Sequence, residues 1–113
     1  MSRLNYGRHL PAFILLFLAQ ESMHGAMLLN KMNTSLPYMK ADGPAIYRAM
    51  YELEKSAAVE ACWDTENPGA ARKCYTITAK GHSLLREFKI DIEERKKNLE
   101  YFLAEFDRLD TKI

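Results

Sequence analysis

The residues best suited to chemistry in this 113-residue chain are two cysteines and three histidines. Cys62 and Cys74 lie at equal distances from Pro68, so a symmetric hairpin would bring their thiols to opposite positions on one face. A redox switch is one interpretation of this pair. A disulfide needs a specific geometry, and thiols in the cytosol stay reduced, so we favour a second interpretation, in which both are small buried hydrophobic side chains.

The spacing of these side chains favours neither a metal site nor an enzyme active site. His9, His24 and His82 do not combine with the cysteines at the separations that metal ligands usually have. The sequence also lacks a nucleophile elbow, a phosphate-binding loop and the His-Glu pairs of metalloproteases. We therefore predict a protein that is not an enzyme and that uses neither a metal nor a cofactor.

Two helices are expected to open the fold. The run from Leu10 to Ala19 is apolar on every side, which predicts a helix buried against several partners or at a subunit interface. Residues 24–35 form a second predicted helix. Its spacing places three apolar residues on one face, namely Met27, Leu28 and Met32.

A third helix is predicted to begin near Gly43, because Asp42 is a good N-cap and Pro44 suits the first turn. Its inward stripe consists of Ile46, Met50 and Leu53. The opposite face is polar and aromatic, with Tyr47, Arg48, Tyr51, Glu52 and Lys55. The pattern is typical of an amphipathic helix.

From Val59 the pattern changes to that of short strands. VEACW and RKCYTIT are rich in β-branched and aromatic residues, and the Asn-Pro-Gly between them is typical of a turn. This predicts a β-hairpin in which Trp63 and Tyr75 share a face and could stack. Three helices and then a hairpin is the order of a winged helix-turn-helix. The predicted fold class is mainly α with a small β-hairpin.

The chain after Thr78 predicts one long helix with an apolar seam. The seam residues follow one another at spacings of 3, 4, 7, 3, 4 and 3. They are Leu85, Phe88, Ile92, Leu99, Phe102, Phe106 and Leu109. A helix of roughly 30 residues would be about 45 Å long, which is more than so small a domain can cover. We expect a winged helix-turn-helix domain over 1–78 and a C-terminal dimerisation helix over 79–113, with helix 10–19 sharing the homodimer interface.

Arg95 interrupts this seam. A charge among apolar side chains is costly unless it is paired or hydrated. Three interpretations remain open for Arg95: an acidic residue of the partner chain, a hydrated gap, or an anionic ligand. We favour the ion pair across the interface.

The N-terminal end of the third helix is the predicted DNA-reading surface, since in helix-turn-helix proteins this end enters the major groove. Arg48 is the expected base reader because arginine can form two hydrogen bonds to guanine, whereas Tyr47 is expected to contact phosphate. Arg72 and Lys73 follow the hairpin turn and could reach phosphate or the minor groove. The predicted DNA-contacting residues are Asn30, Lys31, Lys40, Pro44, Ala45, Tyr47, Arg48, Arg72 and Lys73. The competing interpretation is an ordinary solvated surface.

Net charge adds little to this prediction, because the chain carries only +1. Residues 1–81 contain 9 Lys and Arg against 7 Asp and Glu, and residues 82–113 contain 7 against 8. Attraction to phosphate must therefore come from local placement of charge. The longest apolar run is about half of what a membrane span needs, and no cleavage pattern follows it. We expect a cytoplasmic protein without a membrane partner.

Three motifs stand in order within residues 10–82: HGAMLLNKM, GPAIYRAMYELEKSAAVEACW and ARKCYTITAKG. Together they resemble the PadR-like family of winged helix-turn-helix regulators. The resemblance implies a homodimeric repressor that binds a palindromic promoter site and is often released by a small aromatic or xenobiotic ligand. The chain departs from the family pattern at Ala26, Ala57 and Ala71, which replace Tyr, Gly and Pro. In a left-handed turn Ala57 would carry a steric cost that glycine avoids.

Two functions from different classes follow. The first is a sequence-specific regulator that binds double-stranded DNA as a homodimer, with a small-molecule effector as a further expected partner. The alternative is a winged-helix protein–protein interaction module without specific DNA binding, which the weak net charge and the tyrosines of the third helix favour. The salt dependence of DNA affinity separates the two.

Overall fold

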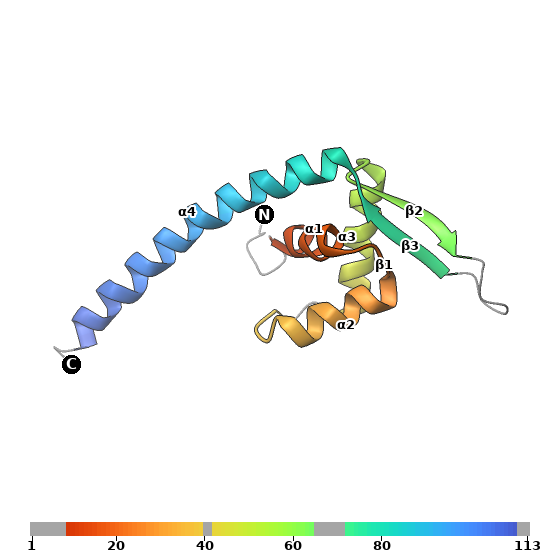
Figure 1. Ribbon diagram of the computed structural model, residues 1–113. Helices are drawn as coiled ribbons and strands as arrows, with labels where there is room; N and C mark the ends of the chain where they lie inside the picture. The colour runs from red at the N-terminus through yellow and green to blue at the C-terminus, as the bar shows by residue number, and fades with distance from the viewer. Residues whose placement is uncertain (1–8, 40–41, 65–71, 111–113) are drawn as a thin grey trace.

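The computed structural model describes residues 9–39, 42–64 and 72–110. Three helices come first, α1 (Leu10–Gln20), α2 (Gly25–Ser35) and α3 (Gly43–Lys55), with the short strand β1 (Met23–His24) between the first two. Strands β2 (Val59–Asp64) and β3 (Arg72–Ile77) follow, and then the long helix α4 (Ala79–Asp110). Figure 1 shows α4 extending from the other elements as a single arm. The mainly α winged-helix prediction with a long C-terminal helix is confirmed.

The sheet has three antiparallel strands in the order β1-β3-β2. The predicted hairpin is present as β2 and β3, with Val59 opposite Ile77 and Asp64 opposite Arg72. The prediction missed β1, which pairs Met23 with Tyr75 along the other edge of β3. A strand of two residues is too short to show an alternating pattern in a sequence.

The core lies where the three helices meet the inner face of this sheet. Its buried side chains include Ile14, Leu15, Leu28, Met32, Ile46, Met50, Leu53, Val59 and Tyr75. The inward stripe predicted for α3 is confirmed. The stripe predicted for α2 is wrong at Met27, which is 49% exposed although Leu28 and Met32 are buried. Residues 27 and 32 are five apart, and this spacing turns them to different sides of a helix.

Both ends of α3 are capped by local hydrogen bonds. At the start, the Asp42 carboxylate accepts a hydrogen bond of 2.9 Å from the backbone N–H of Ala45, as the N-cap prediction requires. At the end, the N–H of Ala58 donates to Leu53 O (2.9 Å) and that of Ala57 to Glu54 O (3.0 Å). This is a Schellman motif. Ala57 has a φ of 69°, so the left-handed turn expected there is present without the usual glycine.

The junction between β3 and α4 fixes the direction of the long helix. The Thr78 hydroxyl accepts a hydrogen bond from the N–H of Gly81 (3.1 Å) and donates to Ala57 O (2.7 Å). A Cβ on Gly81 would lie only 2.1 Å from Ala58 O, so α4 packs against the end of α3 at a distance that only glycine permits. The start of α4 is therefore tied to the turn that follows α3.

The first turns of α4 pack on the core through Leu84, Leu85 and Phe88. The remainder carries mostly exposed side chains, and the molecule measures 65 × 27 × 26 Å. Within the residues the structure describes, no helix is both long and apolar enough to span a membrane.

Candidate nucleic-acid interface

The outer face of α3 presents a continuous exposed stripe. Pro44, Arg48, Tyr51 and Lys55 follow one another at intervals of three or four residues, and each is exposed. Arg48 forms no ion pair with any residue in the described parts of the chain. Its guanidinium donors are therefore available to an acceptor outside the protein.

Tyr47 lies on one flank of this stripe, against the start of α2. A Cβ on Gly25 would come within 2.7 Å of Tyr47 Cε1 and 3.1 Å of its hydroxyl. Glycine at position 25 thus lets the tyrosine ring lie on the backbone of α2. The contact orients the Tyr47 hydroxyl and joins the two helices of the helix-turn-helix.

Lys73 connects the wing, which is the hairpin of β2 and β3, to α3. Its ammonium donates a 3.2 Å hydrogen bond to Glu54 Oε1, and it lies 6.0 Å from the ring centroid of Trp63 and 5.7 Å from that of Tyr75. The Glu54 carboxylate raises the pKa of Lys73 above its usual value, and burial raises the pKa of Tyr75. Trp63 stands opposite Lys73 and Tyr75 opposite Ala61, so the predicted shared face is present and Lys73 contacts both rings.

The other predicted DNA-contacting residues are spread over the same region. Arg72 is exposed, and the alternation of β3 directs it to the face of the sheet opposite Lys73. On α2, Asn30 is exposed and Lys31 is half-buried. Ala45 is half-buried and lines a surface hollow together with Arg48 and Glu52. Lys40 and Ala71 lie outside the described residues.

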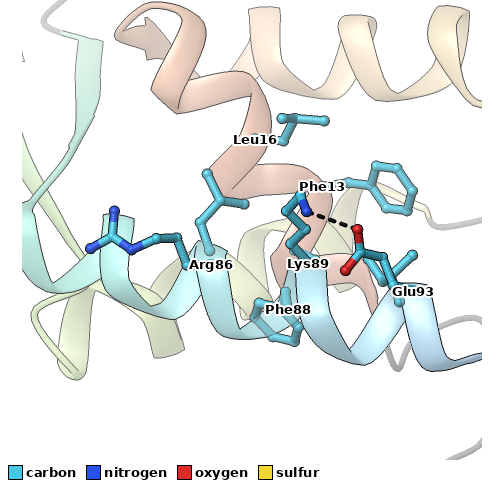
Figure 2. A pocket seen from close by; sticks show the side chains of 9 residues that line it. Phe13, Leu16, Arg86, Phe88, Lys89 and Glu93 are labelled. Atoms are coloured by element: carbon cyan, nitrogen blue, oxygen red, sulfur yellow. Dashed lines mark hydrogen bonds and ion pairs between the residues drawn. The ribbon is translucent and has the colours of Figure 1, made fainter.

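A second surface is an apolar groove of about 410 Å³ between α1 and the first half of α4. Figure 2 shows Phe13 and Leu16 of α1 beside the α4 side chains. Leu85, Phe88 and Ile92 of the predicted seam line it, and Leu16 is 41% exposed. The Lys89–Glu93 ion pair (2.8 Å) lies at its edge, and the Lys89 ammonium lowers the pKa of Glu93. Sequence reasoning named helix 10–19 as interface but did not single out Phe13 or Leu16.

The seam continues along the second half of α4. Leu99, Phe102, Phe106 and Leu109 are all exposed, and Phe102 and Phe106 stack with ring centroids 6.3 Å apart. Arg95 forms an ion pair within its own helix, with its Nε 3.6 Å from Asp91 Oδ1. Asp91 Oδ2 also lies 2.9 Å from His9 Nε2. Asp91 thus gives Arg95 an acidic partner within its own helix, and the ion pair with another chain stays a prediction.

Residues 14–87 match the family described as the transcriptional regulator PadR-like family. That match covers more than half of the chain, including α2, α3, the sheet and the start of α4. The chain belongs to the PadR-like family. This PadR-like protein is therefore a transcriptional regulator and not an enzyme, as the sequence predicted.

Solved structures agree with this assignment. A conserved protein described as a potential transcriptional factor, TM0937, is 30% identical with a TM-score of 0.82, and the match covers 96% of both chains. A PadR-like transcriptional regulator from Bacillus cereus is 27% identical, with a TM-score of 0.72 over 84% of this chain and 91% of that one. PadR from Bacillus subtilis, solved in complex with operator DNA, is 21% identical with a TM-score of 0.68. That match covers 74% of this chain and 48% of PadR, and it concerns the fold alone. No curated protein sequence matches this chain.

Proposed function

We propose that this PadR-like protein is a repressor that binds a palindromic operator in double-stranded DNA through the outer face of α3. The observation that carries the proposal is the exposed stripe of Pro44, Arg48, Tyr51 and Lys55, with an arginine that has no ion-pair partner among the described residues. A stripe of this kind on the second helix of a helix-turn-helix suits the major groove. Arg48 would read guanine. Tyr47, whose ring packs on Gly25, would contact phosphate.

The wing supplies the second part of the interface. Lys73 is held by Glu54, so its role here is to fix the position of the wing relative to α3. Arg72, which is exposed, is the residue we expect to contact phosphate from β3. Asn30 and Lys31 on α2 are expected to contact the backbone beside the recognition helix. The protein would act in the cytoplasm, where the operator is located.

The operator would be bound by a homodimer in which residues 1–78 form the DNA-binding domain and residues 79–113 the dimerisation helix. Support comes from the groove beside Leu16 and from the exposed seam at Leu99 and Phe102. Apolar surface of this extent is costly in water and is expected to be covered by a second copy. Two recognition helices would then reach successive major grooves about 34 Å apart.

A small aromatic effector would bind where the groove between α1 and α4 meets the second copy of the chain. The groove volume of about 410 Å³ lies within the range of ligand pockets, and its lining includes Phe13, Leu16 and Phe88. Bound there, a ligand would alter the separation of the two recognition helices. Addition of 1-naphthol is expected to weaken operator binding by the wild-type protein. Unchanged affinity in the presence of bound 1-naphthol would contradict this part of the proposal.

One alternative has its own support. Tyr38, Tyr47 and Tyr51 are exposed, and the chain carries a net charge of only +1, which suits a protein-interaction module better than a basic DNA-binding surface. A salt titration with a duplex of about 30 base pairs separates the two functions. DNA binding requires log K to fall linearly with log salt concentration, by about 0.9 for each phosphate neutralised. Affinity independent of salt, or no binding at low salt, would favour the interaction module.

A further inference from the structure

The outer face of the sheet carries a row of three chemically reactive side chains. Cys74 of β3 is in register with His24 of β1 on one side and with Cys62 of β2 on the other. The neighbouring row, Met23, Tyr75 and Ala61, contributes to the core. Because side chains alternate along a strand, the row that contains the two cysteines faces away from the core.

The pairing pattern places the Cα atoms of the two cysteines within the range found in disulfides. The N–H of Thr78 donates to Ala58 O (3.1 Å), which makes 58 and 78 a hydrogen-bonded pair. Hydrogen-bonded pairs recur at every second position of an antiparallel ladder, so Cys62 and Cys74 form another. Their Cα atoms are then about 5.5 Å apart, within the range of about 4.4 to 6.8 Å found in disulfides. The Cβ atoms of a hydrogen-bonded pair lie at the wider end of roughly 4.5–5.5 Å and must approach to about 4.5 Å or less, so the bridge draws β2 and β3 together at this position.

Both residues are thiols in this structure, and reagents can reach them. Cys62 is exposed and Cys74 is half-buried. The interpretation of both cysteines as small buried hydrophobic side chains is therefore wrong for Cys62. Across the described ranges no group of three His, Cys, Asp or Glu side chains is placed to hold a metal ion, so the two thiols form a pair and not a ligand set.

We propose that Cys62 and Cys74 form a modification site for hydroperoxides, at which an intramolecular disulfide closes across the wing. The exposed Cys62 thiolate attacks the peroxide oxygen, giving a sulfenic acid and releasing an alcohol, or water from hydrogen peroxide. The Cys74 thiol then attacks the sulfenic sulfur and releases water. Two thiols are oxidised to one disulfide and one peroxide is reduced. His24, in register with Cys74, is the nearest candidate in the sheet to accept the proton of the Cys74 thiol.

The disulfide would restrain the part of the wing that lies next to α3. Trp63 and Lys73 directly adjoin the two cysteines, and Lys73 is bonded to Glu54 of α3. A covalent link between Cys62 and Cys74 closes the chain between them into a loop and lowers the conformational entropy of the unfolded state. Trp63 is the chain's single tryptophan, so its fluorescence reports on this region alone.

The test is to treat the wild-type protein with a small excess of hydrogen peroxide. We expect both thiols to disappear together, the monomer mass to fall by two hydrogen atoms, the Trp63 emission to change and the unfolding temperature to rise. Dithiothreitol should reverse all four effects. None of these measurements uses DNA, so their outcome is independent of the proposed regulator function.

Cys62→Ser is the matched control, since this exposed position tolerates a hydroxyl. Treated with peroxide, it should show neither the rise in unfolding temperature nor the change in Trp63 emission. Three outcomes would overturn the proposal: sulfinic acid on Cys62 with Cys74 still reduced, a dithiothreitol-sensitive covalent dimer as the main product, or an equal response from wild type and Cys62→Ser.

Discussion

Single residues set the strain and the charge pairing around the recognition helix. Asp42, Ile46, Met50 and Leu53 were predicted correctly because capping and helical spacing are local properties of a sequence. The Glu54–Lys73 bond could not be predicted, since it joins residues 19 positions apart whose contact depends on how the wing packs on α3. Local rules therefore describe each face of α3, and packing decides which of its charges are paired.

Ala57 is the residue where a substitution should stabilise the protein. Its φ of 69° costs an L-residue about 1–2 kcal/mol, which glycine avoids at some cost in unfolded-state entropy. We expect Ala57→Gly to raise the free energy of unfolding by about 0.5–1 kcal/mol in urea denaturation. Ala49→Gly, within the regular part of α3, should lower it by a similar amount. A destabilised Ala57→Gly variant would refute the strain at this turn.

The wing contacts predict a loss of stability at alkaline pH. Folding raises the pKa of both Lys73 and Tyr75, so their contributions are fully present below the unfolded-state pKa values, near pH 10. Each contribution is lost as pH rises through the folded-state pKa. Lys73 is 37% exposed, so its share should stay below about 1 kcal/mol. Urea denaturation from pH 7 to 11 should show a decline above pH 10 that is smaller in Glu54→Gln. Equal declines would exclude a contribution from the pair.

At the scale of elements, the α3–β2 turn and the start of α4 form one joint. Thr78 and Gly81 link them through hydrogen bonds and close packing, so the direction of α4 depends on the end of the recognition helix. The heptad pattern predicted α4 well because its spacing persists over the length of the helix. It could not show that α4 begins against Ala58, since that contact is non-local.

Gly81→Ala should disturb this joint. The added Cβ would lie 2.1 Å from Ala58 O and 2.6 Å from Ile77 Cγ1, so α4 must move outward. We expect a loss of about 1–3 kcal/mol in the free energy of unfolding, measured by urea denaturation. Lys80→Ala, at the exposed neighbouring position, should change it by less than about 0.5 kcal/mol. Similar free energies of unfolding for the two variants would show that α4 can move away from Ala58 at little cost.

For the whole molecule, the long arm of α4 is the feature least explained by a single chain. Its seam residues beyond Ile92 are exposed, while those before it line the groove with α1. The sequence indicated this seam, but it did not indicate that Asp91 forms an ion pair with Arg95 within the same helix. Periodicity identifies which side chains share a face, and it cannot say which charges on that face pair within the helix.

The seam predicts the oligomeric state. Leu99→Asp combined with Phe102→Asp should convert a dimer to a monomer in sedimentation velocity, because a buried apolar seam does not accept unpaired carboxylates. Ala104→Asp, which adds the same charge at an exposed position on the opposite side of α4, is the control and should remain dimeric. A wild-type protein that sediments as a monomer at micromolar concentration would contradict the dimer.

The central claim is that the outer face of α3 binds operator DNA, and fluorescence anisotropy with Arg48→Ala tests it most directly. The natural probe is a labelled duplex from the promoter next to the protein's own gene. Arg48→Ala should weaken binding by about 1–3 kcal/mol, or roughly 5- to 150-fold. Arg108→Ala, which removes the same charge from the end of α4, should leave affinity nearly unchanged. Equal affinities for wild type and Arg48→Ala would contradict the account.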